Sequence, residues 1–236
     1  MGYIDYLIKE RRSVRNFDSE VKVPGKILRE CLELAKLAPN SCNMQLWEFH
    51  VVSSTDKLEA MRAACLNQKP TQGCSSLVAF VSQPRHWEDS IKANVERLEE
   101  IPELYRSKEI DHLINFYQTT VSKNYRNDRF GILGQLRKLE GFVDGFHSPT
   151  VREVGLADVR ATVHKNNAFA MMAFMLAMKD KGFDTCVMEG IDSKRVKALL
   201  GLPNDALITA VVACGKSEDE SANECFRFDK EVIFEH

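Results

Sequence analysis

The apolar positions along this chain recur in two patterns. Spacings of three and four residues are typical of amphipathic helices, whereas short alternating or continuous apolar runs are typical of strands. The residues flanking these segments agree, because Pro24 and Pro39 bracket the first helix and Asp192 supplies an N-cap for the last one. We therefore expect helices at residues 24–38, 56–66 and 193–200, and strands at residues 48–53, 76–82, 184–188 and 206–214.

One further helix dominates the hydrophobic pattern. Residues 163–181 contain an unbroken apolar run at residues 168–178, and Gly182 ends the segment. The run is too short to cross a bilayer, which needs about 20 such residues. A helix that is apolar on every side must be buried on every side. We therefore expect a central helix that also meets a second subunit.

Residues 84–160 differ in character from the rest of the chain. Two charged helical segments at residues 86–100 and 103–126 are split by Pro102, and residues 127–149 are richer in glycine and aromatic side chains. We interpret this region as a helical insertion within one domain. It is either a solvated helical excursion or a lid over a site, since long excursions in compact domains often carry function.

Together these elements predict an α+β fold, in which helices surround a small sheet of about four strands. Residues 1–236 form a single domain in this interpretation, with residues 84–160 inserted into it. The tail, residues 218–236, is polar at first and then carries apolar side chains. Such a tail needs a surface to lie on, and a partner subunit would supply one.

Composition narrows the class of protein. The chain has 236 residues, 44% of them hydrophobic and 28% charged, and its net charge of -2 creates no field that would attract nucleic acid or an acidic membrane surface. Its N-terminus lacks the pattern of a secretory signal. Seven cysteines with no C-x-x-C pair, several of them in apolar runs, indicate buried thiols in a reducing cytoplasm.

Several motifs with known chemistry are missing from the sequence. It contains no G-x-G-x-x-G and no G-x-S-x-G, and its histidines lack metal-ligand spacing, so we expect no metal site. Gly215-Lys216-Ser217 resembles the end of a phosphate-binding loop, but Ala210 stands where the first glycine is needed and three acidic residues follow. No constrained pair of catalytic carboxylates or acid–base dyad is identifiable.

The stretch at residues 11–17 concentrates hydrogen-bond donors. Arg11, Arg12 and Arg15 place three guanidinium groups, with the hydroxyl of Ser13, within five residues. Arginine suits a phosphate because its planar group donates two parallel hydrogen bonds. Taken alone, the stretch favours a simpler interpretation than a phosphate site: a solvated basic corner at the C-terminus of a short helix, which the helix dipole stabilises.

Four segments, in their order and spacing, resemble the nitroreductase family of FMN-dependent oxidoreductases. They are residues 11–17, residues 39–49, Asn67-Gln68 and residues 181–203. The resemblance covers roughly residues 3–82 and 160–234, and the insertion matches in position alone. It departs from the family at Leu46, where proline is frequent, and at Cys225, where a basic residue is frequent.

The resemblance implies a homodimer of α+β subunits with a mostly antiparallel central sheet and two FMN molecules at the interface. Arg11 and Arg15 would bind the phosphate and ribityl chain, with further donors from Arg12, Ser13 and the late Arg227. Asn67 would bind the pyrimidine edge, helped by Gln68. Glu189 and Gly190 would place backbone groups near the reactive flavin nitrogen. Pro39, Asn40, Ser41 and Asn43 would come from the other subunit, as would Asn166.

The implied activity is transfer of a hydride from NAD(P)H to FMN and then to a small-molecule acceptor such as a nitroaromatic or a quinone, in a ping-pong cycle. A flavin needs a phosphate clamp, amide partners and a backbone donor rather than a protein acid or base. Two alternatives remain open: a specialised flavin reaction, such as dehydrogenation or reductive dehalogenation, and a flavin-binding protein without turnover. Six aromatic residues of the insertion are candidates to line a substrate pocket: Phe116, Tyr117, Tyr125, Phe130, Phe142 and Phe146. About half of these six are expected to lie in the core of the insertion instead.

Overall fold

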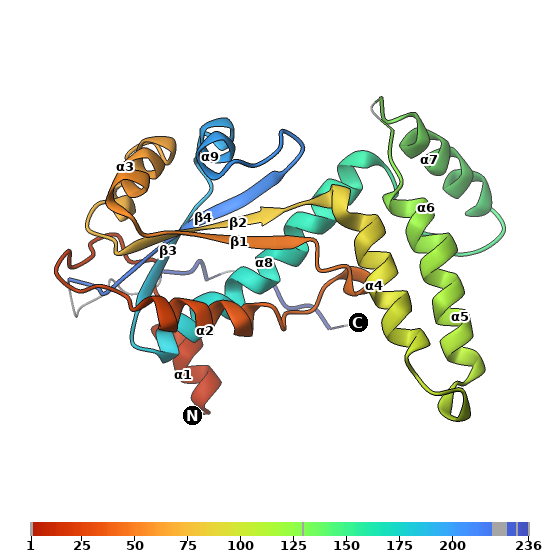
Figure 1. Cartoon of the computed structure of the whole chain (residues 1–236), viewed down its shortest axis with the longest axis horizontal. Coiled ribbons are helices and arrows are strands. Elements are labelled where there is room, and N and C mark those ends of the chain that lie inside the picture. The colour runs from red at the N-terminus through yellow and green to blue at the C-terminus, as the bar shows by residue number, and fades with distance from the viewer. Residues whose placement is uncertain (1, 129, 219–225, 230, 236) are drawn as a thin grey trace.

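The computed structural model describes residues 2–128, 130–218, 226–229 and 231–235 (Figure 1). Its centre is a four-stranded antiparallel sheet in the order β1-β2-β4-β3. The strands are β1 (Trp47–Val52), β2 (Ser76–Ser82), β3 (Asp184–Met188) and β4 (Leu207–Gly215). Each predicted strand is present within a residue or two of its expected bounds, and the α+β prediction is confirmed.

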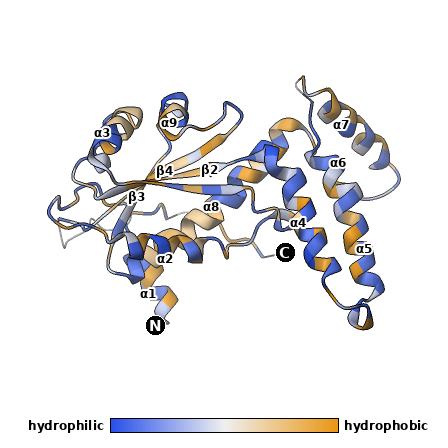
Figure 2. Cartoon of the chain, in the orientation of Figure 1, coloured by the Kyte–Doolittle hydropathy of each residue, from blue (hydrophilic) through white to orange (hydrophobic). Residues whose placement is uncertain are grey.

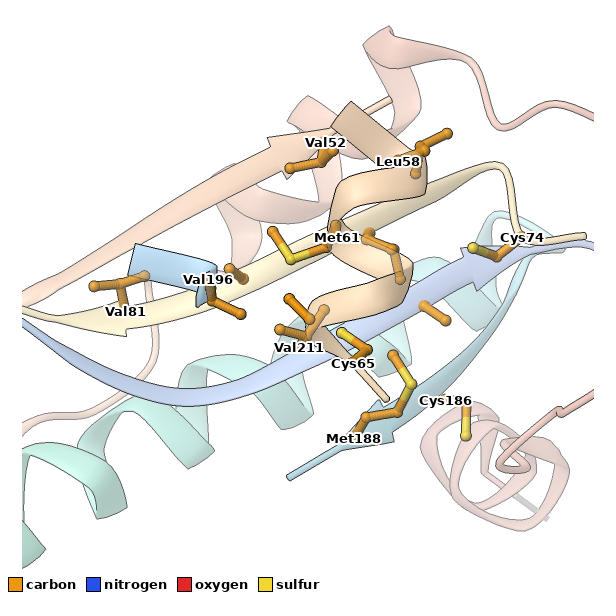
Figure 3. Packing of buried hydrophobic residues seen from close by; sticks show 14 of the residues in the cluster. Val52, Leu58, Met61, Cys65, Cys74, Val81, Cys186, Met188, Val196 and Val211 are labelled. Carbon is orange, nitrogen blue, oxygen red and sulfur yellow. The ribbon is translucent and has the colours of Figure 1, made fainter. Parts of the chain in front are cut away.

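Two pairs of helices cover the two faces of the sheet. On one face α3 (Thr55–Ala64) and α9 (Ser193–Leu200) pack on alternate residues of β2 and β4, among them Leu77, Val81 and Val211 (Figure 3). On the other face α2 (Gly25–Ala35) and α8 (Leu156–Asp180) pack on Val78 and Phe80. All seven residues of β2 are buried, so this strand is covered on both faces.

The central helix α8 is longer and less enclosed than expected. It begins at Leu156 rather than residue 163, because the backbone N–H of Gly155 donates to the Asp158 carboxylate and caps the helix. Phe174 is fully buried against Phe80, but Phe169 is 52% exposed and Met172 is 37% exposed. One chain therefore leaves one side of the apolar helix uncovered.

The region expected to be an insertion is helical and lies beyond one end of the sheet (Figure 1). In Figure 2, polar and apolar residues alternate along α4 and α5, as expected of amphipathic helices. Its last residues, from Leu156 on, belong to α8. Its elements are 3₁₀ turns at Pro84–His86 and Glu103–Tyr105, the helices α4 (Trp87–Glu99), α5 (Lys108–Phe116), α6 (Ser122–Tyr125) and α7 (Ile132–Asp144), and a π-helical turn at Tyr117–Val121.

The structure also places the two ends of the chain. The short helix α1 (Tyr3–Glu10) buries Leu7 and lies near the start of β3 (Figure 1). In the predicted tail, residues 226–229 and 231–235 contain no helix or strand, and their apolar side chains are exposed, while Cys225 lies outside the described residues. No described helix combines the length and apolar character needed to span a bilayer.

Candidate functional site

The arginine-rich stretch is fastened to the end of the sheet by backbone hydrogen bonds. The N–H of Val14 donates to the carbonyl of Thr185 at 3.1 Å, and the N–H of Asp18 donates to the carbonyl of Lys216 at 2.9 Å. Between these bonds the side chain of Phe17 is 5% exposed. The stretch after α1 is therefore a fixed segment of the sheet's end rather than a free loop.

Two glycines make room for Phe17. A Cβ on Gly215 would stand 2.7 Å from the Phe17 ring, and a Cβ on Gly73 would stand 2.4 Å from the Phe17 carbonyl oxygen. Gly73 also has φ +76, a left-handed conformation that side chains other than glycine rarely adopt. The close approach of these backbones holds the arginines at a fixed place.

Among the residues that the structure describes, no acidic side chain neutralises the guanidinium groups of the stretch. No described carboxylate forms a salt bridge with Arg11, Arg12 or Arg15. Arg12 donates to the carbonyl of Lys9 and so caps the C-terminus of α1, which is the simpler of the two interpretations of that residue. Arg11 and Arg15 have no such partner, and Arg15 also lines a cavity of about 550 Å³ beside Lys69.

The electrostatic effect of these arginines reaches the neighbouring strand. Burial raises the pKa of the Cys186 thiol in β3, and the positive charges of Arg15 and Arg11 oppose that rise. Both guanidinium groups therefore act on the same residue of the sheet. This places the two arginines within electrostatic range of one point on β3, as a shared anion site requires.

A second group of predicted residues meets at the far end of β3. The side-chain N–H of Gln68 donates to the carbonyl of Gly190 at 2.7 Å, and the N–H of Asp192 donates to the carbonyl of Ala64 at 2.8 Å. The end of α3 is thereby joined to the turn at Glu189 and Gly190. Gln68 and Gly190, which are distant in sequence, therefore lie side by side.

Both sides of this junction present polar groups without partners. Asn67 has φ +51, and its exposed side-chain amide makes no hydrogen bond with a described residue. The backbone N–H of Gly190 likewise has no acceptor among the described residues. An exposed carboxamide and an exposed backbone donor next to each other can bind the edge of a polar ring.

The remaining predicted site residues lie elsewhere in the chain. The loop at residues 39–46 lies beside α4, whereas the arginine stretch and the end of α3 lie toward the opposite end of the sheet (Figure 1). In the loop, Asn40 accepts a hydrogen bond from the N–H of Gln45, and Ser41 donates to Asn166 at 3.3 Å. Pro39, at its start, is exposed. In a single chain the predicted site residues therefore form two groups. One group lies at the arginine stretch and the end of α3, and the other lies in the loop at residues 39–46.

Two residues of the insertion hold this loop, and the sequence predicted this role for neither of them. Asn94 on α4 accepts from the side chain of Asn43 at 2.8 Å and donates to its backbone carbonyl at 3.0 Å. The hydroxyl of Tyr117 donates to the carbonyl of Cys42 at 3.0 Å. The insertion therefore shapes the loop directly. Tyr117 carried an aromatic signal in the sequence, but nothing in the pattern of α4 distinguished Asn94.

The loop also has a strained backbone and an apolar anchor. Cys42, Asn43 and Gln45 all have positive φ, which is uncommon for residues other than glycine. Met44 is 1% exposed and packs with Tyr117 in the core of the insertion. The Cys42 thiol is half-buried and burial raises its pKa, so the thiol favours its neutral form.

The other candidate residues are more peripheral. Ser13 is exposed and forms a parallel bridge with Thr185. Arg227 lies in the tail, where it donates to the carbonyl of Phe226 at 2.8 Å. Of the insertion's aromatic side chains, Tyr117 and Tyr125 are buried in its core, whereas the others are exposed or partly exposed. No group of three or more potential metal ligands occurs among the described residues.

The chain is similar to known proteins in both sequence and structure. The model of the nitroreductase family matches residues 8–216. MhqN of Bacillus subtilis (strain 168), provisionally named an NAD(P)H nitroreductase, is 25% identical over 222 residues, which cover 94% of this chain and 92% of MhqN.

Solved structures are similar along almost the whole chain. A provisionally named nitroreductase of Bacillus subtilis, ydfN, has a TM-score of 0.74 at 24% identity and covers 99% of this chain and 98% of its own. A provisionally named nitroreductase from Exiguobacterium sibiricum, solved in complex with FMN, has a TM-score of 0.62 at 22% identity, covering 97% and 93%. These likenesses agree with the fold described above.

His164, a half-buried histidine next to the junction, predicts a pH dependence of stability. Its Nδ1 lies 3.0 Å from the hydroxyl of Thr209. Burial lowers the pKa of His164, and Arg160 lowers it further, while Glu189 opposes the shift. The folded chain thus favours the neutral ring, and the unfolded chain binds the proton more readily. Stability is complete above the ordinary histidine pKa and is lost as pH falls below it.

We expect the wild-type protein to lose more of its unfolding free energy between about pH 7.5 and about pH 5.5 than the variant His164→Gln does. Urea unfolding at both pH values measures the difference. The control is His147→Gln, which changes an exposed histidine after α7 and should keep the wild-type difference. Equal losses in the wild type and in His164→Gln would show that His164 does not titrate in this way.

Proposed function

The chain belongs to the nitroreductase family, a family of oxidoreductases, and on that premise we propose that it is an FMN-dependent enzyme. It takes a hydride from NAD(P)H and passes it to an organic acceptor such as a nitroaromatic or a quinone. The relative MhqN is named for NAD(P)H-dependent nitroreductase chemistry, and a structural neighbour was solved with FMN. Both names support the proposal for this chain.

The observation that carries the proposal is the pair of unneutralised arginines at the end of the sheet. Arg11 and Arg15 have no carboxylate partner among the described residues and act on the same point of β3. Two cations near one strand, without a described counter-ion, are stabilised by an anion, and guanidinium groups match the geometry of a phosphate. The donor set therefore fits the phosphate end of FMN, with Arg12 and Ser13 beside it.

The opposite end of β3 fits the ring of the same cofactor. The exposed carboxamide of Asn67 can pair with the pyrimidine edge of a flavin, and Gln68 fixes the turn by bonding to Gly190. The N–H of Gly190, beside Glu189, is a backbone donor available to a ring nitrogen. When bound, FMN supplies the two-electron acceptor and donor chemistry that protein side chains lack. The protein's part is to bind, orient and polarise.

The second group of candidate residues explains why we propose a homodimer. Pro39, Asn40, Ser41 and Asn43, with Asn166, lie apart from the arginines in one chain and would complete the site of a partner subunit. The side of α8 at Phe169 and Met172 is apolar and exposed, as an interface would require. The tail, with Arg227, would lie on the partner.

The insertion takes the role of a lid in this proposal. Asn94 and Tyr117 hold the loop at residues 39–46, so a shift of α4 or α5 would move that loop with it. We regard residues 1–236 as a single domain with a lid at residues 84–160. The buried cysteines, which are free among the described residues, fit a cytoplasmic enzyme.

Removing the proposed phosphate ligands should weaken FMN binding. We expect Arg11→Ala and Arg15→Ala each to raise the dissociation constant of FMN by about tenfold or more, since a charge-assisted hydrogen bond contributes about 1.5–3 kcal/mol. Titration of FMN into the flavin-free protein, followed by flavin fluorescence, measures this. Arg29→Ala, at an exposed arginine on α2, is the matched control. Unchanged FMN affinity in the double variant would disprove the phosphate clamp.

Turnover distinguishes the proposed reaction from its alternatives. Under anaerobic conditions we expect NADH or NADPH to bleach the bound flavin, and nitrobenzene or benzoquinone to restore its colour. Bleaching without reoxidation by either acceptor would instead favour a specialised flavin reaction, such as dehydrogenation or reductive dehalogenation. Bound FMN that neither nicotinamide bleaches would indicate a flavin-binding protein without turnover.

A further inference from the structure

A cavity of about 890 Å³ lies where the insertion meets the beginning of α8. Its walls come from the turn before α4, the end of α6, the start of α7, the first turns of α8 and the start of β4. Figure 1 shows the start of α8 beside the start of α4, with α7 across from them. None of the residues assigned above to FMN lines this cavity, and its volume is typical of small-molecule sites.

Part of the wall is apolar and aromatic. Trp87 and Val159 are half-buried, Tyr125 is 8% exposed, and Leu207 joins the same hydrophobic cluster. Since these side chains are packed on the core of the insertion, their exposed faces are held in place. Rigid aromatic walls favour a ligand with a planar apolar body.

Two cations on the rim lack partners. Arg85 and Arg160 line the cavity from the turn before α4 and from α8, and neither forms an ion pair or a hydrogen bond with a described residue. Their positive charges are therefore available to a ligand. A guanidinium group prefers a carboxylate or a phosphate, which it can bind through two parallel hydrogen bonds.

Two other charged residues of the cavity already have partners within the chain. Lys138 lies 3.1 Å from the carboxylate of Asp158. Asp128 accepts hydrogen bonds from three backbone N–H groups at the start of α7. Asp205 remains as the one lining carboxylate without a described partner. Two guanidinium groups and one carboxylate therefore remain without a described partner. Asp128 keeps its negative charge, but its oxygens are occupied by backbone donors, so the two guanidinium groups are the groups left to bind an anionic ligand.

We propose that this cavity binds a small aromatic carboxylate, with its ring against Trp87 and Tyr125 and its carboxylate toward Arg85 and Arg160. The ligand is separate from FMN, because the two sets of residues do not overlap. The proposal does not rest on the redox function. A protein that failed to bind a flavin would still bind this ligand.

The test uses 2-naphthoate as the probe and 2-naphthalenemethanol as its neutral counterpart, titrated into the purified protein by isothermal calorimetry. We expect naphthoate to bind, to bind more tightly than the alcohol, and to weaken as salt screens the arginines. Arg85→Gln and Arg160→Gln should each weaken naphthoate binding by about tenfold, the loss of one charge-assisted hydrogen bond. Neither variant should alter binding of the alcohol.

Two further variants test whether charge controls the affinity and whether the ring of the ligand lies against Trp87. Asp205→Asn removes the opposing charge and should tighten naphthoate binding, while Trp87→Ala should weaken both probes. Arg29→Gln on α2 is the control for loss of a surface charge, and the melting temperature of each variant confirms that it is folded.

The proposal is overturned by absence of naphthoate binding, by equal affinity for the acid and the alcohol, or by wild-type affinity in both arginine variants. Loss of naphthoate binding in Arg11→Ala with Arg15→Ala, but not in Arg85→Gln or Arg160→Gln, would place the anion at the proposed phosphate clamp instead. That result would also overturn it.

Discussion

The candidate site depends on how the segment after α1 is joined to the end of the sheet. Val14 bonds to Thr185, Asp18 bonds to Lys216, and Phe17 fills the space between them. The ring of Phe17 fits because Gly215 and Gly73 have no Cβ to meet it. These contacts fix the backbone on either side of Val14, so a ligand of the arginines would have to order their side chains but not the main chain. A flexible basic tail would lack this preorganisation.

The strand β3 then links the two ends of the proposed flavin site. The arginines lie at its start, and Glu189 and Gly190 follow its end, where Gln68 fastens the turn to α3. The loop at residues 39–46 belongs to a different part of the chain, held by Asn94 and Tyr117 of the insertion. The division of site residues into two groups, together with an uncovered apolar side of α8, is the physical basis for proposing a dimer.

The sequence was most informative where local pattern determines structure. The apolar run of β2 and the Asp192 cap of α9 predicted those elements at their observed bounds, since burial on both faces and a capped N-terminus leave clear signals. The sequence was less informative where contacts between residues distant in the chain determine the structure. The helix α7 was not predicted, because its interior glycines lower helix propensity; in the structure Gly134 and Gly141 allow α7 to approach the segment before α8.

The lack of a local pattern also explains the other features that the sequence did not predict. The polar first turns of α8 obscured its start, and an apolar helix alone does not reveal which side a single chain leaves exposed. The pairing of Asn43 with Asn94 joins residues from a loop and a charged helix, for which no sequence pattern exists. The resemblance of short segments supplied the site residues, and the fold then showed which of them lie side by side.

The visible absorption spectrum of the purified protein is the most direct test of whether the chain binds FMN. The account predicts the bands of a bound flavin, and FMN released into solution when the protein is denatured. A colourless protein that remains colourless after mixing with FMN would contradict it. In that case the arginines at the end of the sheet would be a solvated basic corner, and the proposed oxidoreductase function would be lost with them.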